Sequence, residues 1–563
     1  MKTTIKTVIC ATMVACSLSS CSDYLELLPM DQVVLENYWT EKADVTSVLY
    51  GCYESLGSKD VLNRIGVWGE LRSDNVTQGR GNTPNEIREL LEENLIPTNI
   101  YCNWASLYGV INRCNTVCYY APQVQKIDPN YSLTDMKANI AEATAIRALC
   151  YFTLARTFRD VPYTTQPSID DDQEYVLPAM PFDQLLDSLI VDLEGVKNDA
   201  VRRYGKEEAR NSVSPIYVPD QNAGRITRWA VCALLADICL WKGDWDKCID
   251  NCNEVLAYKR QVYDELSQEE QLKTIEFFEG IPMIVESTAK GTPVGGAYNQ
   301  NFGDGNSYES IFELNYLSTS GTPKNEYVAS FYGNASNNGY LKSSDFIKDE
   351  IGTSSNPIFK TYYDCRAYES MNVNDEYSIA KYVIADVSFT QSQTTLPKPT
   401  YVYRGADNAH WSFYRLTDIM LMKAEALIER DNTSFSNAFR LITAVNKRAL
   451  HCTENEKKAD TLIFSPTASK AEMEDLLLLE RQREFMFEGK RWFDLVRTAR
   501  RDGNTSRITP LITRKYKSKR NIVKVKMADP NYIYFPYLRG ELKVNPLLHQ
   551  NPAYSNTEDS EMK

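Results

Sequence analysis

The sequence contains little of the chemistry on which most catalytic sites depend. Only three histidines occur in 563 residues, His410, His451 and His549, and they stand far apart in unrelated surroundings. No HExxH, GxSxG or GxxxxGK[ST] motif is present, so the patterns of zinc proteases, serine hydrolases and P-loop proteins are missing. We therefore expect a binding protein rather than an enzyme, with no catalytic residues, no cofactor and no metal.

An excess of positive charge is also missing. The chain has 62 Lys and Arg against 75 Asp and Glu, for a net charge of -13. Nucleic-acid binding needs a basic stripe that neutralises phosphates, so we expect no nucleic-acid partner. The two carboxylates of a glycosidase could lie anywhere among 75 acids. A surface glycosidase therefore stays open as a less favoured alternative.

Beyond the N-terminus, no run is long and apolar enough for a membrane-spanning helix. Residues 1–20 have Lys2 and Lys6, then a short apolar run, then Leu-Ser-Ser before Cys21. This order predicts a secretory signal peptide. The residues before Cys21 resemble a bacterial lipoprotein cleavage box, in which Cys21 becomes the lipidated first residue. We expect residues 21–40 to form a tether and lipid alone to hold the protein to its membrane.

Neither the cysteines nor the acidic runs indicate a metal site. Eleven cysteines follow Cys21, mostly in apolar helical sequence, where cysteine acts as a small hydrophobic residue. None has zinc-site spacing. A calcium site is conceivable at Asp170, Asp171, Asp172 and Glu174, but the spacing is not that of an EF-hand. We interpret that run as a solvated loop.

Helical periodicity organises the chain on both sides of an irregular middle. Residues 224–256 predict a helix from Arg225 to Trp241, a turn at 242–244 containing Gly243, and a second helix from Trp245 to Leu256. Residues 415–450 predict another such pair, and residues 104–158 further helices. Pairs of this length can stack and share their apolar faces. We therefore expect a mainly α protein with a tetratricopeptide-like helix-pair scaffold at about 41–258 and 411–500.

Periodicity is lost at about 259–410, where aromatic residues are scattered among Gly, Asn, Ser and Thr. Loops this long inside a domain are usually functional, so we expect this region to be a loop-rich ligand-binding insertion. Sugars need flat aromatic surfaces together with amides and hydroxyls. Most of the tyrosines are nevertheless expected to cap the core.

A charged and aromatic segment at 476–500 reads LLLLERQREFMFEGKRWFDLVRTAR. On a helix, Glu480, Glu484 and Glu488 form one acidic row, whose mutual repulsion basic groups must offset. Arg481, Arg483 and Arg491 are near enough in sequence to pair with these acids. The apolar residues around the row require docking into a larger body. Gly489 predicts a bend. We interpret the charges as a structural ion-pair network.

The order of residues in this segment resembles the signature helix of the SusD/RagB family. The resemblance is carried by seven residues: Glu480, Arg481, Glu484, Glu488, Gly489, Arg491 and Asp494. Other landmarks follow in the family's order: Gly51-Cys52-Tyr53, Gly224-Arg225, Lys423-Ala424-Glu425-Ala426, Asn545-Pro546 and Gln550-Asn551-Pro552. Ala553 departs from the usual glycine. The resemblance covers residues 41–554, which implies one SusD-like domain that closes with a family segment at 501–554.

The family comprises surface lipoproteins that capture nutrients for an outer-membrane transporter. The resemblance thus implies outer-membrane anchoring, facing the cell exterior, and capture of an oligosaccharide or polysaccharide. It also implies a partner, a SusC-like TonB-dependent barrel over which this protein acts as a hinged lid. An oligopeptide receptor is the alternative within the same family.

Ligand contacts in the family come from the loop after a Ser-Asp landmark, from the start of the next helix and from the irregular middle. Carried onto this chain, the resemblance implies seven ligand-binding residues: Asp74, Arg80, Tyr101, Asn103, Trp104, Tyr298 and Tyr308.

Overall fold

The computed structural model describes residues 38–169, 175–205, 219–266, 275–287, 294–317, 323–348, 351–352, 358–376, 378–390, 396–450 and 462–555. The expected signal peptide, Cys21, most of the tether and the acidic run at 170–174 lie outside these ranges. No helix within them has the length and apolar character needed to cross a membrane.

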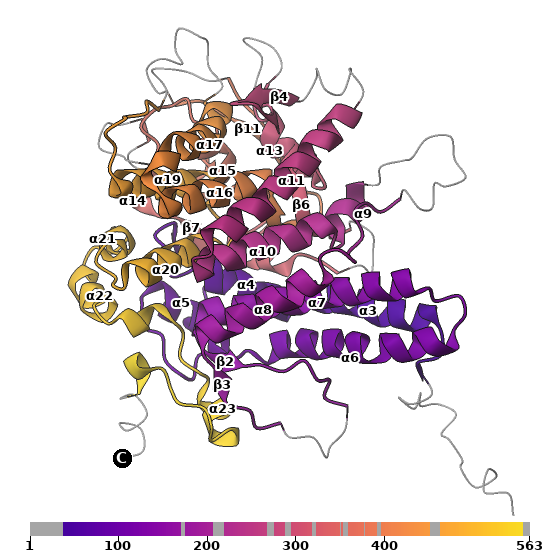
Figure 1. The fold of residues 1–563 in the computed structure, drawn as a ribbon. Coiled ribbons are helices and arrows are strands. Elements are labelled where there is room, and N and C mark those ends of the chain that lie inside the picture. The colour runs from indigo at the N-terminus through magenta and orange to yellow at the C-terminus, as the bar shows by residue number, and fades with distance from the viewer. Residues whose placement is uncertain are drawn as a thin grey trace, which may run out of the picture.

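A continuous series of helices forms the body of the protein, which confirms the mainly α prediction (Figure 1). Each helix packs on the next in the series, and α19 closes it by packing on both α16 and α17. Its members are α3 (Lys42–Leu56), α6 (Ala105–Ile127), α7 (Leu133–Phe158), α8 (Phe182–Val196), α10 (Arg228–Lys242), α11 (Trp245–Glu265), α16 (Leu416–Arg430), α17 (Phe435–Ala449) and α19 (Lys470–Phe485).

The α10–α11 pair forms where the sequence predicts it. Thr227 caps α10 by accepting a hydrogen bond from the Ala230 amide, so the helix begins after this residue rather than at Arg225. Gly243 ends it at φ +86°, a left-handed conformation that glycine adopts without strain. Asp244 then caps α11 through the Lys247 amide. Local capping chemistry therefore sets this hairpin.

Most of the short strands lie in the middle of the chain, between Ile275 and Arg415. The described residues contain six two-stranded antiparallel sheets. Their pairs are β1 (Val76–Gln78) with β7 (Leu341–Ser343), β2 (Val161–Pro162) with β3 (Ala179–Met180), β4 (Ile275–Phe278) with β5 (Ile281–Ile284), β6 (Ser310–Leu314) with β12 (Trp411–Arg415), β8 (Met371–Asn372) with β9 (Ser378–Ile379), and β10 (Ile384–Ser388) with β11 (Thr400–Tyr403). Many of the region's aromatic residues belong to the core, including Tyr298, Tyr327, Phe331, Tyr332 and Tyr368.

Shorter helices complete the fold. These elements are α4 (Lys59–Glu70), α5 (Asn85–Leu91), α9 (Pro219–Gly224), α13 (Gly296–Tyr298), α14 (Asp345–Lys348), α15 (Arg366–Ser370), α20 (Arg491–Asp502), α21 (Ile508–Thr513), α22 (Arg520–Met527) and α23 (Arg539–Val544). All ten cysteines in the described ranges are thiols, and nine of them are buried.

The segment at 476–500 is two helices rather than one bent helix. After α19 ends at Phe485, Phe487 and Gly489 both adopt positive φ, +66° and +67°, before α20 begins at Arg491. This turn packs against α4. A Cβ added at Gly69 would lie 1.8 Å from the Gly489 carbonyl oxygen. Gly69 therefore lets the two backbones meet.

Replacing Gly69 with Ala is expected to destabilise the fold by about 1–3 kcal/mol, because neither backbone can yield to the new methyl group. A Cβ at Gly51, on α3, meets nothing within 4 Å, so G51A is the matched control. It is expected to be neutral or up to about 1 kcal/mol stabilising. Thermal melting of both variants measures the difference, and equal melting temperatures would contradict the close approach.

Candidate functional site

The acidic row of the signature segment (476–500) lies in the interior and is bound by cations from distant parts of the chain. Glu484 pairs with Arg415 and Arg448 at 2.6 Å each, and with Arg366 at 3.2 Å. These cations hold the pKa of Glu484 well below its usual value although burial raises it. Glu488 pairs with Lys381 and Arg415, and its pKa falls to about 2. Both carboxylates are therefore charged at neutral pH.

The expected partners within the segment are only partly correct. Arg483 does pair with Glu480, at 3.0 Å. Arg481 instead binds Asp494, and Arg491 binds Asp74. Arg481 lies next to Glu480 on α19 and therefore on another side of that helix, whereas Arg491 lies beyond the break, at the start of α20.

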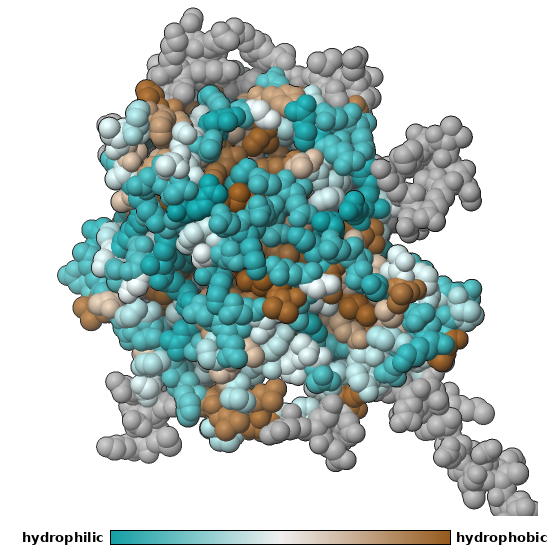
Figure 2. All heavy atoms as spheres, viewed as in Figure 1, coloured by the Kyte–Doolittle hydropathy of each residue, from teal (hydrophilic) through white to brown (hydrophobic). Residues whose placement is uncertain are grey.

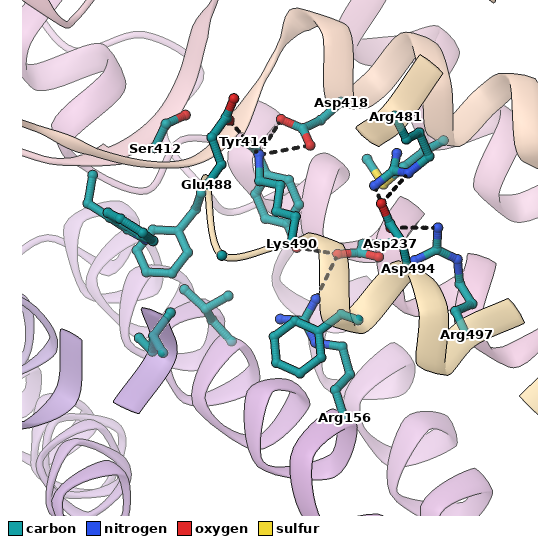
Figure 3. Close-up of a pocket in the computed structure, with 17 residues that line it drawn as sticks. Arg156, Asp237, Ser412, Tyr414, Asp418, Arg481, Glu488, Lys490, Asp494 and Arg497 are labelled. Atoms are coloured by element: carbon teal, nitrogen blue, oxygen red, sulfur yellow. Dashed lines mark hydrogen bonds and ion pairs between the residues drawn. The ribbon is translucent and has the colours of Figure 1, made fainter. Parts of the chain in front are cut away.

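A small interior pocket beside the turn shows how the network continues (Figure 3). Lys490 extends its ammonium group to Asp418 at 2.8 Å and to Glu488 at 3.4 Å. Arg481 and Arg497 converge on the Asp494 carboxylate. These side chains bind one another, so this pocket belongs to the structural ion-pair network.

Asp74 belongs to the same network, which corrects its expected role in ligand binding. Its carboxylate is fully buried, binds Arg491 at 2.8 Å and accepts a hydrogen bond from Gln482. In the same stretch, Glu70 accepts a hydrogen bond from the Gly489 amide. The Ser-Asp landmark therefore holds the signature segment in place and faces no solvent.

Most of the other expected ligand residues are also structural. Trp104 is 4% exposed and packs edge-on against Phe158. Tyr298 is 2% exposed and donates its hydroxyl to the Ala380 and Ile384 carbonyls. Rings buried in this way cannot stack on a ligand.

Contacts within the protein also involve Tyr101, Asn103 and Tyr308. Tyr101 is buried, and its carbonyl accepts the Trp68 indole N–H. The Asn103 side chain accepts a hydrogen bond from the Ala105 amide, at the first residue of α6. Tyr308 is half-buried and donates its hydroxyl to the Lys259 carbonyl.

Arg80 differs, because it is exposed at the edge of a groove. Its guanidinium binds Asp375 at 3.2 Å and Glu376 at 2.5 Å, with about half of the side chain open to solvent. The groove encloses about 480 Å³, including space open to solvent. It is lined by residues that include Arg80, Asn334, Asn337, Asn338, Lys342, Asp375, Glu376, Ser378 and Tyr403.

Glycines bring the two sides of this Arg80 groove together. Gly79 and Gly81 donate backbone hydrogen bonds to Tyr340 and Gly339, at 2.7 and 3.0 Å. A Cβ at Gly81 would stand 2.7 Å from the Asn338 carbonyl oxygen. The loop expected from glycine and proline is therefore packed closely beside β7, and it holds Arg80 in place.

The groove combines an exposed aromatic ring with amides and charged groups. Tyr403 is 38% exposed, and Asn372 donates a hydrogen bond to its hydroxyl at 3.0 Å, which fixes the ring. Asn337 and Asn338 are exposed on the turn after Gly333. A flat ring beside amide donors and acceptors suits a ligand that has apolar faces and a hydroxyl rim.

Of these groove residues, only Arg80 was expected from the sequence. The others come from stretches that are far apart in the chain, at 334–342, 375–378 and 403. The turn-rich run Asn334-Ala-Ser-Asn-Asn-Gly339 is the one local signal that could have indicated an exposed polar loop.

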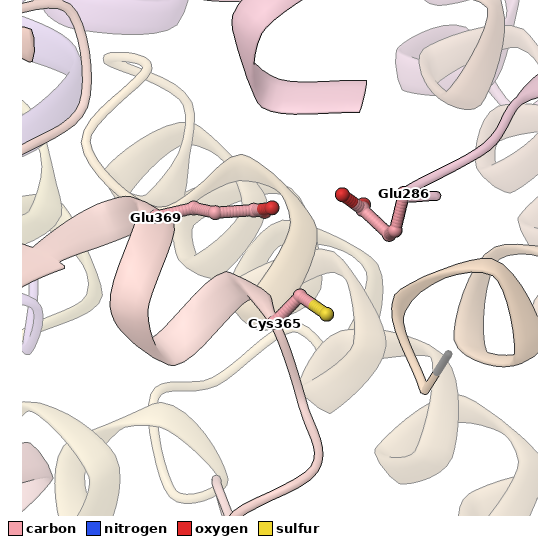
Figure 4. A group of neighbouring side chains, drawn as sticks. All are labelled: Glu286, Cys365 and Glu369. Atoms are coloured by element: carbon pink, nitrogen blue, oxygen red, sulfur yellow. The ribbon is translucent and has the colours of Figure 1, made fainter. Parts of the chain in front are cut away.

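A buried acidic cluster lies elsewhere in the interior (Figure 4). The carboxyl groups of Glu286 and Glu369 point toward each other beside the Cys365 thiol, and the three ligand atoms lie within 4.8 Å of one another. Burial and then Glu286 raise the pKa of Glu369 well above 4.5. Arg448 and Lys381 act on this carboxyl in the opposite direction and lower its pKa, but burial and Glu286 have the larger effect.

Replacing Glu369 with Gln is expected to stabilise the protein at high pH. The pKa of this carboxyl is higher in the folded than in the unfolded chain. Its contribution to the free energy of unfolding is therefore fully present below about pH 4.5 and is lost as the pH rises. E369Q keeps a donor toward Glu286 and removes the titration. At pH 8 we expect a gain of about 1–3 kcal/mol over wild type, and little gain at pH 5. Melting at both pH values measures this, with the exposed E276Q as control; equal gains at both would contradict it.

Comparison with known proteins gives one consistent result. A model of the SusD family matches residues 368–554, which include the signature segment. A SusD-like protein of Formosa agariphila is 23% identical over 501 residues, covering 85% of this chain and 88% of the relative.

Solved structures share the fold at low identity. A SusD superfamily protein from Bacteroides thetaiotaomicron superposes with a TM-score of 0.62 and 19% identity, covering 92% of this chain and 99% of that chain. A laminarin-binding SusD-like protein gives a TM-score of 0.59 and 18% identity, with 92% and 100% covered. The family model, the sequence relative and the solved structures all show that this chain is similar to proteins of the SusD family, and the family model places that similarity in residues 368–554.

Proposed function

We propose that this protein is a cell-surface receptor that binds an oligosaccharide or polysaccharide in the Arg80 groove. The single observation that carries the proposal is the exposed Tyr403 ring, fixed by Asn372 among the groove's amides and charges. Sugars stack an apolar face on such a ring and direct their hydroxyls to amides, carboxylates and guanidinium groups. The laminarin-binding relative of the same fold supports a glycan over other ligands.

The charges of the groove favour a neutral or weakly charged glycan. Arg80 is already bound by Asp375 and Glu376, so its positive charge is balanced within the protein. The three groups together offer both donors and acceptors to a hydroxyl rim. A strongly anionic ligand would have to displace the two carboxylates from Arg80.

Delivery and location form the second part of the proposal. We infer that Cys21 carries lipid, that the protein faces outward from an outer membrane, and that it passes its ligand to a SusC-like TonB-dependent barrel, over which it acts as a lid. The match to the SusD family model supports this arrangement, and the lipoprotein-like sequence before Cys21 supports the anchor. Co-purification from detergent-solubilised membranes tests it, and isolation of the protein alone under mild conditions would contradict it.

Affinity electrophoresis of the chain from Ser22 onward tests ligand class. Gels would contain a panel of plant, microbial and host polysaccharides, and soluble products would be monitored in parallel. Retardation by a glycan without product release is the expected result. Release of products would instead favour a glycosidase, and binding to mixed peptides without retardation by any glycan would favour a peptide receptor.

A further inference from the structure

A strongly basic segment lies outside the groove and the ion-pair network. Residues 514–527 read RKYKSKRNIVKVKM, with seven Lys and Arg and no acid, in a chain whose net charge is -13. The overall charge therefore hides a local positive cluster, which our expectation from net charge overlooked. Its basic residues are Arg514, Lys515, Lys517, Lys519, Arg520, Lys524 and Lys526.

Some of these cations are used by the fold. Lys515 donates hydrogen bonds to the Leu71 and Ser73 carbonyls, at 3.1 and 2.6 Å. Lys526 donates to the Glu93 carbonyl, and Lys519 pairs with Glu92 at 2.6 Å. These contacts fix the segment on the body of the protein.

Other cations point outward. The side chain of Lys517 is 89% exposed and its ammonium group lies 3.8 Å from Asp345. Arg520 and Lys524 are exposed at the two ends of one turn of α22. The outer face therefore carries several cations that neighbouring acids hold only loosely.

The same face carries two exposed aliphatic side chains. On α22, Val523 and Met527 are buried, whereas Ile522 is 61% and Val525 is 75% exposed. Residues three apart lie on one side of a helix, so Ile522 and Val525 form a pair. Figure 2 shows hydrophobic atoms on this edge, at the left of the view over α22, next to hydrophilic ones.

We propose that α22 and residues 514–519 form a docking surface for the anionic, phosphate-bearing face of a lipid membrane. A helix that is anchored on one side and presents aliphatic residues among lysines and arginines on the other is suited to the plane of headgroups. The cations meet the negative surface potential, and the aliphatic pair enters the boundary with the acyl chains. A soluble polyanion would engage the cations but leave Ile522 and Val525 in water.

Vesicle co-sedimentation tests this surface, with the chain from Ser22 onward and without attached lipid. The probes are vesicles of phosphatidylcholine alone and of phosphatidylcholine with an equal part of phosphatidylglycerol. We expect binding to the anionic vesicles only, weakening as salt rises. K517Q/K524Q is expected to lower the partition coefficient about 30-fold, since each cation near such a surface contributes about 1 kcal/mol.

The aliphatic pair distinguishes a membrane from other polyanions. I522S/V525S is expected to lower the partition coefficient about tenfold. Matched controls on other faces, K126Q/K543Q and I127S/V191S, are expected to stay within about twofold of wild type. No binding to the anionic vesicles would overturn the proposal. Unchanged binding of I522S/V525S, with melting equal to wild type, would also overturn it, because binding through charge alone is a property of any polyanion site.

Discussion

Replacing Glu484 with Gln is expected to lower the free energy of unfolding by about 3–5 kcal/mol. Glu484 is 2% exposed and receives three arginines. The amide keeps the size of the side chain but removes its charge, so Arg448 keeps a buried charge that lacks its main partner, and Arg415 is left with Glu488 alone of the two acids in the row that it binds. The cost arises from these buried cations more than from the lost contacts.

Unfolding in guanidinium chloride measures this loss. It is followed by both circular dichroism and tryptophan fluorescence, because the two transitions must coincide before a single free energy of unfolding is meaningful. The control is E54Q, an exposed glutamate of α3, expected to stay within about 0.5 kcal/mol of wild type. A loss below about 1 kcal/mol in E484Q would mean that the network is not what holds α19 against α16 and α17.

Replacing Tyr403 with Ala is expected to weaken glycan binding about 10- to 100-fold. Covering an aromatic ring contributes roughly 1.5–3 kcal/mol, and Tyr403 is the exposed ring of the groove. The ring stands at the end of β11 and meets Asn372 through its hydroxyl. Its loss should therefore leave the fold intact.

Calorimetric titration with the glycan selected by electrophoresis measures this effect. Y119A is the matched control, because Tyr119 on α6 is 45% exposed and does not line the groove. We expect Y119A to bind as wild type does. Equal affinity of Y403A and wild type would remove Tyr403 from the binding surface.

The helical framework could be predicted from the sequence because its causes are local. Periodic apolar residues and Gly243 indicated the α10–α11 pair within a few residues of where they act, whereas the Thr227 cap, also a local feature, was not recognised. The break at Gly489 was also indicated by a single glycine. The resemblance to the SusD/RagB family followed from the order of charged residues in the signature segment, which needs no knowledge of their partners.

The ion-pair partners of the acidic row could not be predicted, because they lie on elements that are distant in the sequence. The three arginines that bind Glu484 lie 36, 69 and 118 positions away from it in the sequence. The sequence does not show which basic residue an acidic residue will contact. We therefore expected the basic neighbours in sequence to be the partners, and this prediction was partly wrong. The same limit applies to aromatic residues. Trp104 and Tyr298 look like exposed rings on loops until the elements that cover them are in place.

The Arg80 groove illustrates what such prediction misses. Its residues come from separate stretches that a close glycine contact and the β1–β7 pair bring together. Only Arg80 was reached through the family resemblance, and the remaining candidates turned out to support the fold.

Hydrogen exchange with and without the retained glycan tests the central claim most directly. Glycan bound in the Arg80 groove should slow amide exchange at 79–82, 334–342 and 400–403, the stretches that form its walls. Slowed exchange confined to 101–108 and 298–308, with none at the groove, would contradict the account. It would return the ligand site to the positions that the family resemblance implies.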